Sequence, residues 1–258
     1  MLTKDHAICI RATDYSETSQ IVVLFTRENG KISAIAKGSK RPKSSFDGPI
    51  ELFSCGQIIF AASHDSKLAT LTEFEQKSHC SGLANNLFSL NCASFATELV
   101  NSLTTEYDPH PELFDQFLQF LQNTENSSSN RDCLALLILF QFSLLKEVGV
   151  QPILNICVNC KTRHQTFHRM PNGEDARCEI YFSSSANGLI CRDCEPAFTD
   201  KLKLSAASAN CLTDFKKIAD ANDKTLKEIE KVLIYHFTET LGRPPKMAKH
   251  ILGRDDVG

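Results

Sequence analysis

Apolar residues follow two different periods along the chain. Through about residue 76 they form short runs rich in Ile, Val, Phe and Thr, and turn signals such as Glu28-Asn29-Gly30 and Asp47-Gly48-Pro49 separate the runs. These runs predict strands over 7–12, 21–26, 32–36, 50–62 and 68–74. Five short strands in this length suit a small barrel, and the OB-fold is the common nucleic-acid-binding form of such a barrel.

From about Leu83 onward the apolar period becomes helical. One stripe begins at Leu83 and ends before Asp108-Pro109, and Pro111 suits the first turn of the next helix. A Ser-rich loop over 123–130 precedes a mostly buried helix that Ser129 caps, and a further stripe runs over 226–241. We therefore predict an α+β chain, with an OB-fold barrel over 1–78 and a helical domain over 79–258.

Composition is that of a globular chain of 258 residues, with 42% hydrophobic and 23% charged residues. The most apolar stretch, over 133–145, is far too short to span a bilayer, so we expect no membrane insertion. Eleven cysteines without an apolar secretory segment near the N-terminus indicate a reducing, cytoplasmic location.

Charge is distributed unevenly, although the total is only -3. Residues 1–50 contain eight basic and five acidic residues, a net charge of +3, so the other 208 residues carry -6. The run 37–43, Lys-Gly-Ser-Lys-Arg-Pro-Lys, has four positive charges and lies in the predicted loop between the third and fourth strands. Such a loop favours nucleic acid only slightly over an ordinary solvated surface.

Two matched cysteine pairs, Cys157-x-x-Cys160 and Cys191-x-x-Cys194, predict a zinc site within an insert over about 153–198. Each pair forms a short knuckle, and two knuckles bring four sulfurs to one point. A catalytic zinc ion keeps an open coordination position, which four cysteines do not leave. We therefore favour a structural zinc ion.

Other interpretations of these cysteines are a thiol redox pair, for which one pair would suffice, and a Cys2His2 finger that uses His164 and His168. Only three residues separate Cys160 from His164, too few for the helix of such a finger. Cys178 lies alone between the pairs and is more simply an ordinary buried thiol than a further ligand.

Several separate motifs give the chain a family resemblance that extends to about Leu252. They are Tyr15-Ser16-Glu17-Thr18-Ser19 followed by Leu24-Phe25-Thr26, then Gly30-Lys31, Ala36-Lys37-Gly38, Glu112-Leu113-Phe114 and Leu241-Gly242-Arg243-Pro244. In this order and spacing they resemble the RecO family of bacterial recombination mediators. The segment from Gly188 to Cys194 resembles the zinc-bearing branch of that family.

The resemblance implies a protein without catalytic residues that acts in recombinational DNA repair near the nucleoid. It would bind single- and double-stranded DNA and anneal complementary strands. It would also help to load the recombinase RecA onto DNA coated by single-strand-binding protein, together with RecR. The rival classes are a thiol oxidoreductase or zinc hydrolase, and an adaptor that joins two proteins without touching DNA.

The resemblance also implies particular site residues. The family's basic barrel positions match or adjoin Lys31, Lys37, Lys40, Arg41 and Lys43, and less closely Arg11 and Arg27. Near the C-terminus, Arg243 and Lys246 fall where the family has basic residues that help to hold the acidic tail of single-strand-binding protein. Here Met247-Ala248 replaces the Ser-Arg often found next to them.

Overall fold

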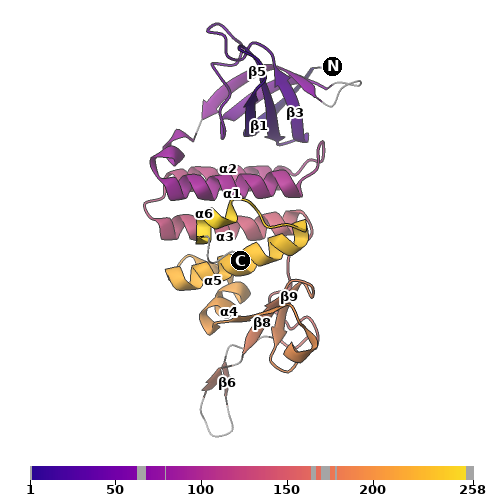
Figure 1. The fold of residues 1–258 in the computed structure, drawn as a ribbon, viewed down its shortest axis with the longest axis vertical. Helices are drawn as coiled ribbons and strands as arrows, with labels where there is room; N and C mark the ends of the chain where they lie inside the picture. The colour runs from indigo at the N-terminus through magenta and orange to yellow at the C-terminus, as the bar shows by residue number, and fades with distance from the viewer. Residues whose placement is uncertain are drawn as a thin grey trace. The chain divides into compact units, whose positions relative to one another are not determined.

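The computed structural model describes residues 2–62, 68–78, 80–163, 167–169, 175–177 and 179–253. The chain forms two compact units, one of Met1–Ala93 and Leu99–Asn126, the other of Ser94–Glu98 and Ser127–Gly258. Both units contain helices, and the N-terminal barrel strands belong to the first unit (Figure 1). The boundary that we place at residue 78 coincides with the end of the last barrel strand and otherwise stays a prediction.

The first strands form a closed barrel in the order β1-β2-β3-β5-β4. The β3 and β5 strands are parallel, and the other neighbours are antiparallel. This order is that of the OB-fold, so the predicted fold class is confirmed. Inward-facing residues such as Val22, Leu24, Ile58 and Phe74 fill the interior. The strands are β1 Leu2–Asp14, β2 Gln20–Thr26, β3 Gly30–Ala36, β4 Cys55–Ala61 and β5 Ala69–Ser78.

The fourth strand is shorter than its apolar run predicts, because it begins at Cys55 and not at Ile50. Phe53 has a φ of 67°, a left-handed conformation that an extended strand does not allow. Ile50 and Phe53 are nevertheless buried. They belong to a loop that folds back onto the barrel, so their apolar character reports burial and not strand structure.

Two helices follow the barrel, α1 at Leu87–Leu103 and α2 at Pro111–Glu125. Both appear where the helical period predicts them, with Pro111 in the first turn of α2. The ring of Phe25, on β2, lies against those of Phe114 and Phe117 on α2, with centroids 6.1 and 6.4 Å apart. The barrel and α2 therefore share apolar packing within the first unit.

The second unit is built around α3, Asn130–Glu147, which contacts α5, Asp223–Leu241. The side chain of Ser129 accepts a hydrogen bond from the Asp132 amide and caps α3, as predicted. The remaining helices of the described residues are α4 Ala206–Thr213, α6 Ala248–Leu252 and the short 3-10 turns Ser81–Asn85, Glu195–Ala197 and Phe215–Ile218. None of the described helices is both long enough and apolar enough to cross a membrane.

Short strands between α3 and α4 carry the cysteine pairs. One sheet has the order β10-β8-β9, and a separate hairpin pairs β6 with β7. The strand bounds are β6 Phe167–Arg169, β7 Asp175–Arg177, β8 Ile180–Ser183, β9 Gly188–Cys191 and β10 Lys201–Leu204. The pairs predict knuckles but not this small sheet, because its strands are only three or four residues long.

Candidate metal centre and nucleic-acid interface

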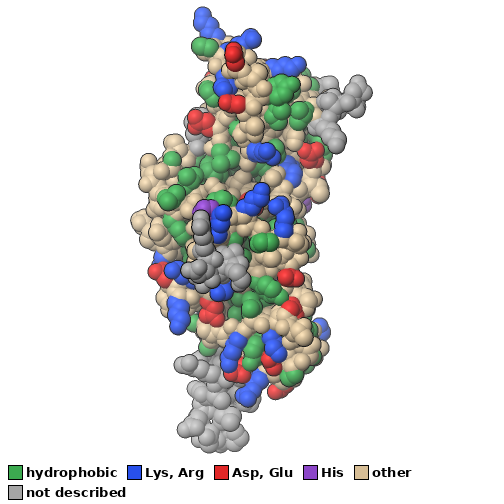
Figure 2. Space-filling model, in the orientation of Figure 1, with side chains coloured by type: hydrophobic (Ala, Val, Ile, Leu, Met, Phe, Trp, Pro, Cys, Tyr) green, Lys and Arg blue, Asp and Glu red, His purple; other side chains and the backbone are tan. Residues whose placement is uncertain are grey.

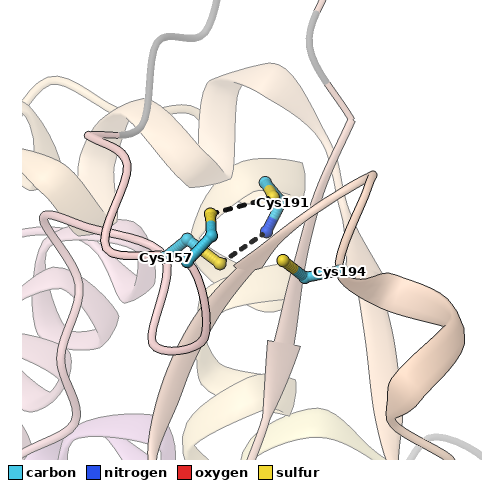
Figure 3. Close-up of side chains that lie close together, drawn as sticks. Cys157, Cys191 and Cys194 are labelled. Atoms are coloured by element: carbon cyan, nitrogen blue, oxygen red, sulfur yellow. Dashed lines mark hydrogen bonds between the residues drawn. The ribbon is translucent and has the colours of Figure 1, made fainter.

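Four cysteine sulfurs meet in the second unit. The sulfurs of Cys157, Cys160, Cys191 and Cys194 all lie within 4.8 Å of one another, and those of Cys160 and Cys191 are 3.7 Å apart. Ligands about 2.3 Å from a tetrahedral zinc ion lie roughly 3.8 Å from each other. The predicted cysteine cluster is confirmed, and its dimensions fit a metal ion. Figure 3 shows Cys157 approaching Cys191 and Cys194, which belong to another segment of the chain.

Backbone pairing brings the two knuckles together. Ile153 donates its amide hydrogen to the Asn187 carbonyl and accepts a hydrogen bond from Leu189, and Val158 donates to Leu189, each at 2.9 Å. Gly188 allows this approach, because a Cβ there would lie 2.3 Å from the Ile153 carbonyl oxygen. The chain before the first pair is thus added to the edge of β9, which ends in the second pair.

Polar contacts surround the sulfurs. The Cys191 amide donates to the sulfur of Cys157 at 3.5 Å (Figure 3), and the side-chain amide of Asn159 donates to that of Cys194 at 3.3 Å. A hydrogen bond with Thr162 lowers the pKa of Cys160 to about 6, whereas burial raises the pKa of Cys191 to about 12. A bound dication would favour the thiolate form of all four cysteines.

The cluster also bears on the other interpretations of the cysteines. Among the described residues, this cluster is the one group of His, Cys, Asp and Glu side chains close enough to hold a metal ion. His164 and Cys178 lie outside the described residues, as does the side chain of His168. All four sulfurs within one cluster favour a metal over a single redox pair.

The loop between β3 and β4 is fixed to the barrel at several points. The side chain of Gln20, buried at the start of β2, accepts hydrogen bonds from the Ser39 hydroxyl and the Ile50 amide, and donates one to the Ile50 carbonyl. Phe46 is only 3% exposed, and its carbonyl accepts a hydrogen bond from Gln76. These bonds hold both ends and the middle of the loop, and most of the residues between them are exposed.

Three of the predicted basic residues project from this loop without a partner among the described residues. Lys37, Arg41 and Lys43 are exposed, and no described ion pair or side-chain hydrogen bond involves them. Lys40 instead forms an ion pair with Asp14 at 2.7 Å. Figure 2 shows Lys and Arg side chains at the outer end of the barrel, in the upper part of the view.

The remaining predicted DNA residues lie elsewhere on the first unit. Arg11 is exposed on β1. Arg27 forms ion pairs with Glu28 and Asp115, whose hydrogen bonds raise the pKa of the arginine above its usual value. Lys31 is buried, and its ammonium donates to the carbonyls of Asn101 and Thr104 at 2.6 Å. The side chains of Arg27 and Lys31 therefore already have partners within the first unit.

The predicted partner-binding residues, Arg243 and Lys246, are both exposed after α5. Their segment is anchored to α1, because Glu98 accepts hydrogen bonds from the amides of Lys246 and Met247, each at 2.8 Å. Lys246 and Met247 contribute only their backbone amides to these bonds with the Glu98 carboxylate, so the side chain of Lys246 is not used by this anchor.

Sequence reasoning missed the role of Gln20 and the contacts of Lys31. A glutamine at the first position of an apolar strand was the available signal for Gln20, since a buried amide needs hydrogen-bond partners. For Lys31 no local signal exists, because its acceptors lie 70 and 73 positions further along the chain.

Comparison with known proteins agrees with these features. A family model described as recombination protein O N terminal matches residues 1–79, and one described as recombination protein O C terminal matches residues 84–249. DNA repair protein RecO of Bacillus pumilus is 32% identical over 249 residues, covering 94% of this chain and 90% of that protein. The Bacillus subtilis protein of the same name is 31% identical over 249 residues, with coverage of 94% and 91%. The chain therefore belongs to the RecO family of DNA repair proteins.

Proposed function

We propose that the chain binds DNA through the loop between β3 and β4 and acts as a recombination mediator without chemical catalysis. The observation that carries this proposal is the exposure of Lys37, Arg41 and Lys43 on a loop whose ends and middle are held by hydrogen bonds. Cations held in this way neutralise phosphates and release counterions, which gives affinity without sequence preference.

The same surface would support annealing of complementary strands. Two strands that share one basic surface repel each other less and are concentrated together, after which base pairing supplies the specificity. On DNA coated by single-strand-binding protein, we propose that the chain works with RecR to load RecA. Arg243 and Lys246 would contact the acidic tail of single-strand-binding protein through their exposed cations.

For the metal, we propose a structural zinc ion held by Cys157, Cys160, Cys191 and Cys194. Two observations support zinc: the spacing of the sulfurs and the all-thiolate donor set, which soft and borderline metals prefer. Four protein ligands leave no coordination position for a reacting water molecule, so we propose no hydrolytic reaction at this zinc ion.

The DNA proposal is tested by replacing Lys37, Arg41 and Lys43 with Ala. We expect affinity for a single-stranded oligonucleotide to fall at least tenfold, and the slope of log affinity against log salt to decrease by about 2, since each lost phosphate contact on single strands contributes about 0.7. Annealing of complementary oligonucleotides should slow in parallel.

The matched control replaces Lys216, Lys224 and Lys227, three exposed lysines of the second unit, and removes the same charge. Equal losses from the two triple variants would contradict a local binding surface. Unchanged binding in the loop variant, with annealing retained, would place the DNA-binding surface elsewhere on the chain. A parent protein that neither binds DNA nor anneals strands would favour an adaptor that does not contact DNA. For the tail, Arg243→Ala with Lys246→Ala should weaken binding of an acidic C-terminal peptide more than the lysine control does.

A further inference from the structure

Tyr15 is an aromatic residue that the barrel does not use for packing. Its exposed fraction is 64%, whereas Phe46 and Phe53 are only 3% and 4% exposed. These two are the aromatic residues of the loop over 37–54, between β3 and β4, which we call the basic loop. Tyr15 lies in the turn between β1 and β2, which is closed by hydrogen bonds from the amides of Tyr15 and Ser16 to the Ser19 carbonyl, at 3.0 and 3.2 Å. A single exposed apolar residue is ordinary on a protein surface, so exposure alone does not indicate a binding role. The position of Tyr15 relative to the basic residues is more informative.

The Tyr15 turn and the basic loop are bonded to each other. The Lys40 amide donates to the Thr18 carbonyl at 3.1 Å, and the Gly38 amide donates to the Ser19 hydroxyl at 3.2 Å. Asp14, next to Tyr15, forms an ion pair with Lys40 at 2.7 Å. Strand pairing agrees with this arrangement, because Gln20 lies opposite both Asp14 and Ala36. The aromatic residue therefore shares one end of the barrel with the free cations.

An aromatic face next to phosphate-binding cations suits unpaired bases. Every base has a π-face that can stack on a tyrosine ring, and stacking is tolerant of sequence. In a duplex the base faces are already stacked on their neighbours, so such a ring adds little. We propose that Tyr15 stacks on a base of a single strand whose phosphates are held by Lys37, Arg41 and Lys43, and gives this end of the barrel its preference for single strands. The inference rests on the DNA binding proposed above.

Affinity measurements separate stacking from charge. Tyr15→Ala should lower affinity for oligothymidylate about tenfold, leave the affinity for a duplex of equal length unchanged, and leave the salt slope unchanged. Tyr15→Phe keeps the ring and should retain affinity. The matched control is Tyr107→Ala, which removes another exposed tyrosine of the first unit and should change neither affinity.

A direct optical test is available because the chain contains no tryptophan. Tyr15→Trp introduces a single indole, and its fluorescence should be quenched by oligothymidylate and much less by the duplex. Equal loss of both affinities in Tyr15→Ala, or an indole emission that neither DNA changes, would overturn the stacking role. If the ring at position 15 contacts a protein partner and not DNA, the indole emission should stay the same with either DNA.

The failure of this inference is distinguishable from that of the proposed function. If the triple loop variant loses DNA affinity and Tyr15→Ala does not, the loop binds phosphates and only the stacking role is wrong. If neither variant changes the affinity, DNA binding by this end of the barrel is wrong as well.

Discussion

The side-chain amide of Gln141 on α3 donates a hydrogen bond of 2.9 Å to Oε1 of Glu230 on α5, inside the core of the second unit. Both side chains are fully buried. Neither Oε2 of Glu230 nor Oε1 of Gln141 has a hydrogen-bond partner among the described residues. Both atoms are acceptors, so a proton on the carboxyl group supplies the donor that this pair lacks.

Glu230 should make the protein less stable as the pH rises. Burial raises its pKa to about 8, against a smaller opposing effect of the Gln141 hydrogen bond. The unfolded chain releases this proton near pH 4.5, so between that pH and about 8 the folded state binds one more proton than the unfolded state. The free energy of unfolding should therefore fall across this window, by at most about 1 kcal/mol per pH unit, and stay level above it. Denaturant unfolding at several pH values measures this.

Glu230→Gln is the control for that measurement, because an amide keeps the shape and can still pair with Gln141 but does not titrate. The variant should lose the decline between pH 4.5 and 8 that the parent shows. Identical pH profiles for the parent and Glu230→Gln would mean that Glu230 is not protonated in the folded state.

Lys31 should stabilise the first unit. Its ammonium contacts the carbonyls of Asn101 and Thr104 at the C-terminal end of α1, where unpaired carbonyls and the helix dipole favour a cation. Lys31→Met keeps most of the aliphatic stem but leaves these carbonyls without their donor, and should cost about 1–3 kcal/mol in denaturant unfolding.

The matched replacement is Lys37→Met, at an exposed position of the same barrel, which should change stability by less than about 0.5 kcal/mol. The two variants should differ in the opposite sense in DNA binding. Lys37→Met should weaken the affinity for DNA, whereas Lys31→Met, measured where it is folded, should retain it. If Lys31→Met reduces DNA affinity without loss of stability, the ammonium contacts phosphate and not α1.

Local patterns predicted the elements that have a clear period or a strong turn signal. The barrel strands, the cap at Ser129, the Pro111 start of α2 and the cysteine cluster follow from residues within a few positions of each other. The predicted start of β1, at residue 7, was wrong because β1 already begins at Leu2. The predicted start of β4 was wrong as well, because Ile50 is buried as part of a loop that Gln20 holds. Apolar runs report burial, and burial does not distinguish a strand from a loop.

Clustered basic residues in the sequence do not by themselves define a DNA-binding surface, because some of them form ion pairs in the folded chain. The run 37–43 predicts a basic surface, yet Lys40 in that run is paired with Asp14, and Arg27 with Glu28 and Asp115. Glu28 is adjacent to Arg27, but Asp14 lies 26 positions from Lys40 and Asp115 lies 88 positions from Arg27, so no short window of the sequence shows these two partners. The folded chain therefore narrows the candidate DNA surface to the cations that remain unpaired among the described residues.

Removal of the proposed zinc ion should unfold the knuckle region. Cys160→Ser replaces a thiolate ligand with a hydroxyl, and we expect loss of the stoichiometric zinc together with faster amide hydrogen exchange in β8 and β9. Chelation of the parent protein should have the same effect. Cys211→Ser, at a buried cysteine outside the cluster, should retain the metal. One zinc ion per chain in purified Cys160→Ser would contradict the four-cysteine site.

Gly188 should be required for zinc affinity although it is not a ligand. A Cβ at this position would lie 2.3 Å from the Ile153 carbonyl oxygen and 2.6 Å from Cγ1 of Val158, so Gly188→Ala must push the first knuckle away from β9. Gly149→Ala is the matched control: its φ of 76° imposes backbone strain, but its Cβ would meet nothing within 4 Å. Competition with a chromogenic chelator should therefore show weaker zinc binding in Gly188→Ala than in Gly149→Ala. Equal zinc affinities would show that the two knuckles hold their positions without the close approach at Gly188.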